Sequence, residues 1–155
     1  MADRTPPAQR SDYVDFYPIQ TRWMDNDAYG HVNNAVHYSL FDTAVNGWLI
    51  DRGLLDPRYS ETFGLVVETG CRYHSEFSFP DRVTAGLRVA RLGTSSIRYE
   101  VALFRNEEPQ AAAEGFFVHV YVNRATRRPV PIEADRRAAF ESLMIDVAWR
   151  DLAAL

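Results

Sequence analysis

Residues 22–34 read Arg22-Trp23-Met24-Asp25-Asn26-Asp27-Ala28-Tyr29-Gly30-His31-Val32-Asn33-Asn34. This stretch decides the fold, because it joins a strand-like segment to a long segment with helical periodicity. It contains carboxylates, a histidine, amide side chains and a glycine within thirteen residues. Ordinary connecting loops are less rich in functional groups, so this one predicts a chemical site.

The end of the stretch suits a helix N-terminus. Asn33 and Asn34 have side-chain oxygens that can accept hydrogen bonds from first-turn N–H groups. The remaining N–H groups and the positive end of the helix dipole form a receptor for a developing oxyanion. Asp27 comes just before this terminus, where a carboxylate can act as a nucleophile or as a general base toward water. A carboxylate facing an oxyanion receptor indicates acyl transfer.

The run D-x-D-x-x-G-H-V-N-N, followed by a helix and four strand-like segments, resembles the hot-dog-fold thioesterases of the 4-hydroxybenzoyl-CoA thioesterase type. The resemblance covers residues 13–143 approximately. It implies that Asp27, the second Asp of the pair, is the catalytic carboxylate, and that a backbone N–H at about Asn34 polarises the thioester carbonyl. The implied fold class is α+β, a hot-dog fold in which an antiparallel sheet wraps around one long central helix.

The G-H-V-N-N part is also similar to plant acyl-ACP thioesterases. Their motif supplies a catalytic Asp, an Asn two residues later and a His two residues after that. Those positions are Asp27, Tyr29 and His31 in this chain. Tyr29 departs from the pattern, so the likeness does not extend to a complete Asp/Asn/His set.

Composition narrows the class of protein. At 155 residues the chain is long enough for one domain with a real core. The net charge of −4 argues against nonspecific nucleic-acid binding, which needs a basic surface. The single Cys71 excludes an intrachain disulfide framework and fits a reducing cytoplasm.

The N-terminal residues have no apolar signal-peptide core, and no apolar run approaches the ~20 residues of a membrane span. We therefore expect a disordered tail at 1–12, a single domain at 13–155, a cytoplasmic protein and no membrane partner.

Periodicity predicts one long helix and an antiparallel meander. Apolar residues follow three- and four-residue spacings from Asn34 to about Gly53, and Gly53 is a suitable C-terminal stop. A second, more charged helix is predicted from Glu133 to about Trp149. Apolar and polar residues alternate in five predicted strands, at about 13–23, 64–77, 83–89, 97–103 and 114–122.

An antiparallel sheet with one long helix on one face leaves an edge strand exposed, which an isolated protein must protect. The resemblance implies that two protomers pair into a continuous sheet, as a homodimer or a dimer of dimers. It also implies that the active sites lie at the protomer interface.

The other polar residues of the loop each have two interpretations. His31 can share a proton with Asp27 or with the attacking water, or it can bond to a nearby backbone group. Tyr29 can line the acyl pocket or donate a hydrogen bond, and Asn33 can contact substrate as well as cap the helix. Asp25 can be a second acid, although fixing the loop through hydrogen bonds is the favoured interpretation.

Residues 91–96 resemble the segment near which coenzyme A docks in the family. Arg91, beside the hydroxyls of Ser95 and Ser96 and free turn N–H groups, suits a phosphate. A simple hairpin turn would have the same residues, so both interpretations stay open.

The remaining titratable residues are assigned structural roles. Glu68 is expected to face solvent. His37, His74 and His119 have no metal-ligand spacing, so we expect surface or hydrogen-bonded core histidines and no metal site.

The leading hypothesis is an acyl-CoA thioesterase that releases a free carboxylic acid and coenzyme A and uses no metal or redox cofactor. A hot-dog enoyl-thioester hydratase or dehydratase is the second hypothesis, because His31 could take part in proton transfer. A non-catalytic acyl-CoA-binding module is the third.

Overall fold

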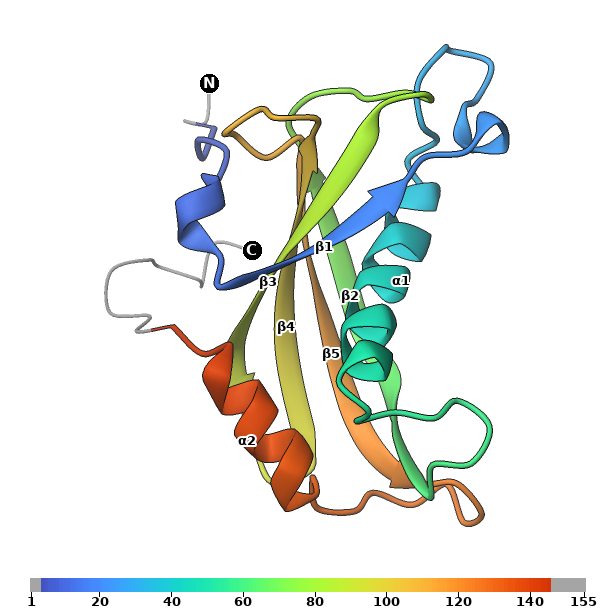
Figure 1. Ribbon diagram of the computed structural model, residues 1–155, viewed down its shortest axis with the longest axis vertical. Helices are drawn as coiled ribbons and strands as arrows, with labels where there is room; N and C mark the ends of the chain where they lie inside the picture. The colour runs from blue at the N-terminus through green and yellow to red at the C-terminus, as the bar shows by residue number, and fades with distance from the viewer. Residues whose placement is uncertain (1–3, 146–155) are drawn as a thin grey trace.

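A computed structural model describes residues 4–145 (Figure 1). Its centre is one antiparallel five-stranded sheet with the strand order β1-β3-β4-β5-β2. The strands are β1 (Asp15–Gln20), β2 (Thr62–Tyr73), β3 (Arg82–Leu92), β4 (Ser96–Arg105) and β5 (Ala113–Asn123). The α+β class and the hot-dog arrangement expected from the sequence are confirmed.

The long helix α1 (Val36–Asp51) lies along one face of the sheet (Figure 1). It buries a stripe of side chains because their spacing repeats with the helical turn. The stripe consists of Leu40, Phe41, Ala44, Val45, Trp48 and Leu49. These residues form the main core with inward-facing residues of the sheet, among them Leu87, Val101 and Phe117.

The helix ends where the sequence predicted. Gly53 has a φ of +67°, a left-handed conformation that L-residues with a side chain adopt reluctantly. The N–H of Leu54 then donates to the carbonyl of Leu49, which closes the last turn. The helix therefore stops at Asp51, and the chain turns toward β2.

A second helix, α2 (Ala134–Ser142), packs Phe140 onto the same core. The N–H of Val89 on β3 donates to the carbonyl of Leu143, which fixes α2 near the end of β3. The predicted extension to Trp149 lies partly outside the described residues.

Two predicted strands have different bounds in the structure. The strand expected at 13–23 is confined to β1, because Trp23–Asp25 form a turn of 3-10 helix. The strand expected at 64–77 begins earlier and ends at Tyr73, because the N–H groups of His74 and Ser75 both donate to the carbonyl of Ala112.

The expected disordered tail at 1–12 is wrong for its later part. Arg10–Asp12 form a short 3-10 helix, and Ala8 is fully buried. The N–H of Ala8 donates to the carboxylate of Glu114 on β5. This segment covers a small second cluster with Tyr13 and Phe104 on the face of the sheet opposite α1. Its composition resembles a tail, but its burial depends on these distant partners.

The two edge strands differ. β1 is six residues long and contains Pro18, whose missing N–H and fixed φ discourage further strand pairing. β2 is twelve residues long and has no proline. Its middle, residues 65–69, is exposed and includes Leu65, Val66 and Val67.

Among the described residues, neither helix is long and apolar enough to cross a membrane.

Candidate functional site

The loop between β1 and α1 is held by Asp25. Its buried carboxylate accepts hydrogen bonds from the backbone N–H of Arg22 at 2.8 Å and from the Arg22 guanidinium at 2.8 and 3.1 Å. Its backbone carbonyl accepts from the N–H of Asn33. Asp25 therefore fixes the loop, as the favoured interpretation of the sequence held.

The loop is also attached to the segment that follows β2. The side-chain oxygen of Asn26 accepts from the N–H of Phe79 at 3.0 Å, and the N–H of Val32 donates to the carbonyl of Phe77 at 2.8 Å. Asn26 and Val32 form an isolated antiparallel bridge across the loop. These bonds give the five residues between the bridge partners a defined conformation.

Asp27 lies inside that bridge with only 16% of its side chain exposed. One carboxylate oxygen accepts from the N–H of Tyr29 at 2.8 Å. The other faces the side-chain amide of Asn33 at 3.4 Å and Nδ1 of His31 at 4.0 Å. The predicted candidates Asp27, His31 and Asn33 are thus brought together, with a carboxylate oxygen between two polar groups.

His31 bonds to the backbone and lies between two carboxylates. Its Nδ1 is 3.0 Å from the carbonyl of Val32, and its Nε2 is 3.7 Å from a carboxylate oxygen of Glu76. The hydrogen bond to Val32 raises the pKa of His31, and the negative charges of Asp27 and Glu76 act in the same direction. The protonated form is favoured, which suits a group that neutralises charge beside Asp27.

Asn33, and not Asn34, holds the turn that leads into α1, whose N-cap residue is Ala35. The side-chain oxygen of Asn33 accepts from the N–H of Ala35 at 2.9 Å, and its carbonyl accepts from the N–H of Val36. The carbonyl of Asn34 accepts from the hydroxyl of Tyr73 at 2.8 Å. Within residues 4–145, the backbone N–H of Asn34 has no hydrogen-bond acceptor.

A cleft of about 270 Å³ opens beside this terminus. Its walls come from the loop, the start of α1 and the segment after β2, and include His31, Asn34, His37 and Tyr73. Asp27 is not among its lining residues, but its carboxylate is 4.0 Å from Nδ1 of His31, which is one of them. Burial lowers the pKa of His37, whose Nδ1 is 3.1 Å from the carbonyl of Asn33. The cleft therefore has a neutral imidazole, a phenol and a free N–H on its walls.

Tyr29 is 86% exposed and does not line this cleft. Its ring stacks loosely on His31, with 6.4 Å between ring centroids.

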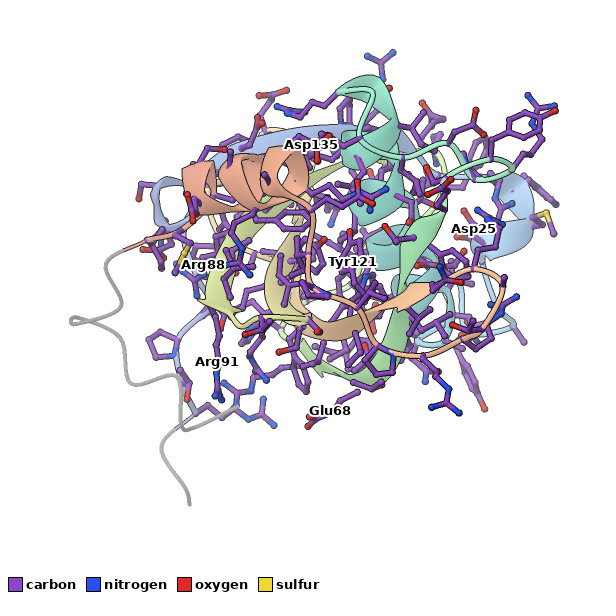
Figure 2. All side chains as sticks on the ribbon, turned by 90° about the horizontal axis from the view of Figure 1, so that it is seen from below. Asp25, Glu68, Arg88, Arg91, Tyr121 and Asp135 are labelled. Carbon is purple, nitrogen blue, oxygen red and sulfur yellow. The ribbon has the colours of Figure 1, made fainter. Side chains whose placement is uncertain are left out.

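Arg91, Ser95 and Ser96 are not brought to the loop within one protomer. β1 enters the loop directly after Gln20, which pairs with Arg82 at the start of β3. Arg91 is nine residues farther along β3, or about 30 Å at 3.3 Å per residue. Figure 2 shows Arg91 and Asp25 on opposite sides of the molecule.

A second cavity, of about 190 Å³, lies at the other end of α1. We call it the His119 cavity; it is lined by Asn46, Leu49, Leu55, Pro57, Phe63, Gly64, His119, Tyr121 and Arg124. His119 is buried, and its Nε2 has no hydrogen-bond partner among the described residues. This differs from the hydrogen-bonded core histidine expected from the sequence. The sequence left open whether His119 lies at the surface or in the core, and it gave no sign of a cavity beside it.

The other expected structural residues fit their assignments. Glu68 is exposed and points outward from the sheet (Figure 2). His74 pairs with Glu114 at 2.6 Å. Within the described part of the chain, no three His, Cys, Asp or Glu side chains are placed to hold a metal ion.

Comparisons with known proteins find one family model and several solved structures that are similar to this chain. The family model of the Thioesterase-like superfamily matches residues 21–140. The PA5185 protein from Pseudomonas aeruginosa strain PAO1 is 52% identical, with 90% of this chain and 97% of that chain covered and a TM-score of 0.87. The PA2801 protein from Pseudomonas aeruginosa, described as a candidate thioesterase, is 32% identical, with 82% and 98% covered and a TM-score of 0.76.

A more distant structure shares the fold. Slr0204 from Synechocystis, a 1,4-dihydroxy-2-naphthoyl-CoA thioesterase, is 18% identical, with 83% of this chain and 96% of that chain covered and a TM-score of 0.74. No curated protein matches the sequence.

Proposed function

The chain belongs to the Thioesterase-like superfamily and is a thioester hydrolase, and from this premise we propose that it hydrolyses acyl-CoA thioesters with Asp27 as its catalytic carboxylate. The single observation that supports this most is the free N–H of Asn34 at the N-terminus of α1, on the wall of a cleft and in the same loop as Asp27. Donor and carboxylate are the two groups that acyl transfer from a thioester requires.

Asn34 is the proposed oxyanion donor. Backbone N–H groups at helix N-termini point toward solvent and are aided by the helix dipole. As the thioester carbonyl becomes tetrahedral, its oxygen gains negative charge, and a donor already fixed at that point stabilises the transition state. Asn33 and the Tyr73 hydroxyl hold the backbone of this turn in place, so the donor does not need to reorganise.

Asp27 is the proposed base or nucleophile. As a base it removes a proton from water, and the new hydroxide adds to the carbonyl. Collapse of the tetrahedral intermediate breaks the C–S bond, and the coenzyme A thiolate takes the proton back from Asp27. As a nucleophile, Asp27 itself adds to the carbonyl and expels the thiolate, and water then hydrolyses the mixed anhydride. His31, with its raised pKa, stabilises the charge of the carboxylate between steps.

Single-turnover hydrolysis in heavy-oxygen water separates the two routes. Label found in the Asp27 carboxylate, by mass spectrometry of the digested protein, indicates the nucleophilic route. Label confined to the released acid means that water attacked the acyl carbon, either directly with Asp27 as the base or in the hydrolysis of the anhydride; trapping of the anhydride with hydroxylamine then separates these two routes.

We propose a homodimer, or a dimer of dimers, in which the exposed β2 edges of two copies pair. Such pairing completes the backbone hydrogen bonds of the edge and covers Val66 and Val67. It also turns the β3–β4 end of the partner toward the Asp27 loop of the first protomer. Arg91, Ser95 and Ser96 would then contact coenzyme A phosphates from the partner. The proposed reaction uses no metal or redox cofactor.

The test is thiol release from short, long and aromatic acyl-CoA thioesters by the parent and by Asp27→Asn. We expect the parent to hydrolyse one acyl class and the variant to lose about 10²- to 10⁴-fold in kcat/KM, because a positioned acid–base group contributes that much.

Asp51→Asn is the matched control, since this carboxylate is exposed at the far end of α1. It should turn over at the parent's rate. Equal rates for the parent and a folded Asp27→Asn would contradict the proposed role of Asp27.

A further inference from the structure

His37, on the first turn of α1, has one ring nitrogen that is bonded and one that is not. Its Nδ1 is 3.1 Å from the carbonyl of Asn33. A carbonyl oxygen only accepts, so Nδ1 carries the proton and donates it, and Nε2 has the lone pair in the neutral ring. Burial lowers the pKa of His37, and the charge of His31 acts in the same direction, so this neutral form is favoured.

The second nitrogen of His37 is accessible, although only 4% of the residue is exposed. Among the described residues, Nε2 has no hydrogen-bond partner, yet it is not one of the buried polar atoms that lack one. It therefore borders open space, and the space beside His37 is the cleft of about 270 Å³. Nε2 of His119 differs, because it is enclosed as well as unpaired. Nε2 of His74, which also lines the cleft, pairs with Glu114 at 2.6 Å.

The ring of His37 is held in place by two aromatic neighbours. Tyr73 meets it in a T-shaped arrangement with 4.9 Å between ring centroids, and Phe77 packs beside it at 5.0 Å. Together with the hydrogen bond from Nδ1 to Asn33, these contacts fix the direction of Nε2. A polar group fixed in this way does not need to reorganise when a reactant binds.

His37 and Asn34 line the same cleft and are three residues apart in the sequence. Residues with this spacing are neighbours on one face of a helical turn. The backbone N–H of Asn34, the proposed oxyanion donor, and the lone pair of His37 therefore lie near each other. The cleft offers one donor and one acceptor at the place where the thioester carbonyl is proposed to react.

The substrate's chemistry indicates what binds to this acceptor. A thioester group has acceptor atoms and no N–H or O–H, so it complements the N–H of Asn34 and not Nε2 of His37. Water is the reactant that brings O–H donors to this point. One water takes up about 30 Å³ in the liquid, so the cleft has room for it. A water that donates to Nε2 keeps its oxygen lone pairs free for the acyl carbon.

We propose that His37 is a further catalytic residue of this thioester hydrolase and holds the attacking water through Nε2. In the general-base route, the water donates one hydrogen bond to His37 while Asp27 removes its other proton. This inference rests on the proposed acyl-CoA hydrolysis.

In the nucleophilic route, the same water hydrolyses the anhydride. Its oxygen bonds to the acyl carbon, one of its protons passes to Nε2, and the bond between the acyl carbon and the Asp27 oxygen breaks. The free acid and the Asp27 carboxylate are released. The imidazolium of His37 then loses its proton to solvent, which balances the proton that the coenzyme A thiolate takes up.

Two substitutions separate the two nitrogens of His37. His37→Asn places an amide N–H near the position of Nδ1, so it keeps the bond to Asn33 and has no group at the position of Nε2. His37→Gln reaches the position of Nε2 with a carbonyl oxygen that accepts from water. We expect His37→Asn to lose about 10²-fold in kcat, the cost of a misplaced reactant. His37→Gln should recover about tenfold of that loss, because one hydrogen bond is restored.

A competing nucleophile distinguishes this role from a structural one. Hydroxylamine attacks acyl groups without the help of a base, so it does not need the acceptor that holds water. With hydroxylamine present, and after subtraction of the uncatalysed reaction, the ratio of hydroxamate to free acid should rise by about tenfold or more in His37→Asn. A distorted turn would lower both products together. An unchanged ratio would therefore overturn the inference, as would equal ratios in His37→Asn and His37→Gln.

His119→Phe is the matched control. It removes both nitrogens from a second buried histidine whose pKa is also lowered by burial, at the other end of α1. Its rate and its product ratio should equal those of the parent. Parental hydrolysis by His37→Asn would contradict the inference and leave the role of Asp27 standing. A parent that hydrolyses no thioester would instead end the proposed function, and this inference with it.

Discussion

The two ends of helix α1 have opposite characters. At its N-terminal end, polar groups of the loop bond to one another, and the N–H of Asn34, a residue that lines a cleft, has no acceptor among the described residues. At its C-terminal end, the His119 cavity has apolar and polar walls, and Nε2 of His119 has no hydrogen-bond partner among the described residues. The sixteen residues of α1 hold the two ends about 24 Å apart.

The difference teaches where the proposed thioester chemistry belongs. The cleft at the N-terminal end, about 270 Å³, has the N–H of Asn34 on its wall and Asp27 in the adjoining loop, whereas the cavity at the C-terminal end, about 190 Å³, has no carboxylate on its walls. The helix holds the two ends apart within one protomer. The proposed pairing of two β2 edges brings the cleft of one copy toward the opposite end of the other.

The largest effect is expected from separating the two copies. Val67 is 60% exposed at the middle of β2, and a lysine there would place a charge within the edge that the two copies are proposed to pair. Val67→Lys should behave as a 17.7 kDa monomer in analytical ultracentrifugation and lose more than about 10²-fold in turnover, because half of each site is missing.

Val14→Lys is the control for this prediction, since Val14 is 44% exposed before β1, at the opposite edge. It should stay dimeric and active. A fully active monomer of Val67→Lys would contradict the incompleteness of one copy.

The next largest effect is expected from removing the backbone N–H of Asn34, near the N-terminal end of α1. Asn34→Pro removes the backbone N–H, which has no acceptor among the described residues, so no hydrogen bond of the turn before α1 is lost. Its kcat should fall by about 10²- to 10³-fold, the usual cost of losing an oxyanion donor. Asn34→Ala keeps the N–H and should stay within a few-fold of the parent. Equal losses in the two variants would assign the role to the side chain instead.

The stability that His119 contributes near the C-terminal end of α1 should fall in acid. His119 has a folded pKa of about 4, below its ordinary value of 6.5, so below pH 6.5 the unfolded chain binds a proton that the folded chain does not. Stability from the neutral ring is complete above pH 6.5 and is lost as the pH falls toward 4, by about 3 kcal/mol.

Urea unfolding at several pH values checks this. His119→Phe should lose less stability than the parent between pH 6.5 and 4. His37, whose pKa is also lowered, acts equally in both proteins and cancels in the difference. Parallel pH dependences would show that His119 is not the acid-sensitive group.

The smallest effect is at the helix stop. Gly53→Ala places a Cβ where no atom lies within 4 Å, so the cost is that of the left-handed φ alone. We expect a loss of about 1 kcal/mol in the free energy of unfolding, measured in urea, with unchanged turnover. A neutral or stabilising effect would mean that the helix end relaxes to another conformation.

Much of the fold was predictable because periodicity is local. The stripe of α1, its stop at Gly53 and the β3-β4-β5 part of the predicted meander follow from residues near one another in sequence. The meander was wrong for β2, which pairs with β5 at the edge of the sheet and not with β3, because that pairing joins distant segments. The ends of β1 and β2 could not be predicted from local sequence. They depend on the hydrogen bond between Asp25 and Arg22 and on the carbonyl of Ala112. The packing of Ala8 against Glu114 joins residues 106 positions apart, which no local pattern reveals.

In the candidate site too, residues of one loop could be predicted together, whereas contacts between distant segments could not. Asp27, His31 and Asn33 were predicted together because one loop contains them, and the structure places a nitrogen of Asn33 at 3.4 Å and one of His31 at 4.0 Å from the same carboxylate oxygen of Asp27. The contact of Tyr73 with Asn34 and the cavity at His119 arise from long-range pairing of β2 and β5, so sequence alone did not indicate them.

Chemical rescue of Asp27→Ala tests the central claim most directly. The variant should lose about 10²- to 10⁴-fold in acyl-CoA hydrolysis, and added formate, a small carboxylate that can occupy the space left by the side chain, should restore part of the rate in proportion to its concentration. Formate should not accelerate the parent. A folded, dimeric Asp27→Ala that hydrolyses the thioester at the parent's rate without formate would contradict the account.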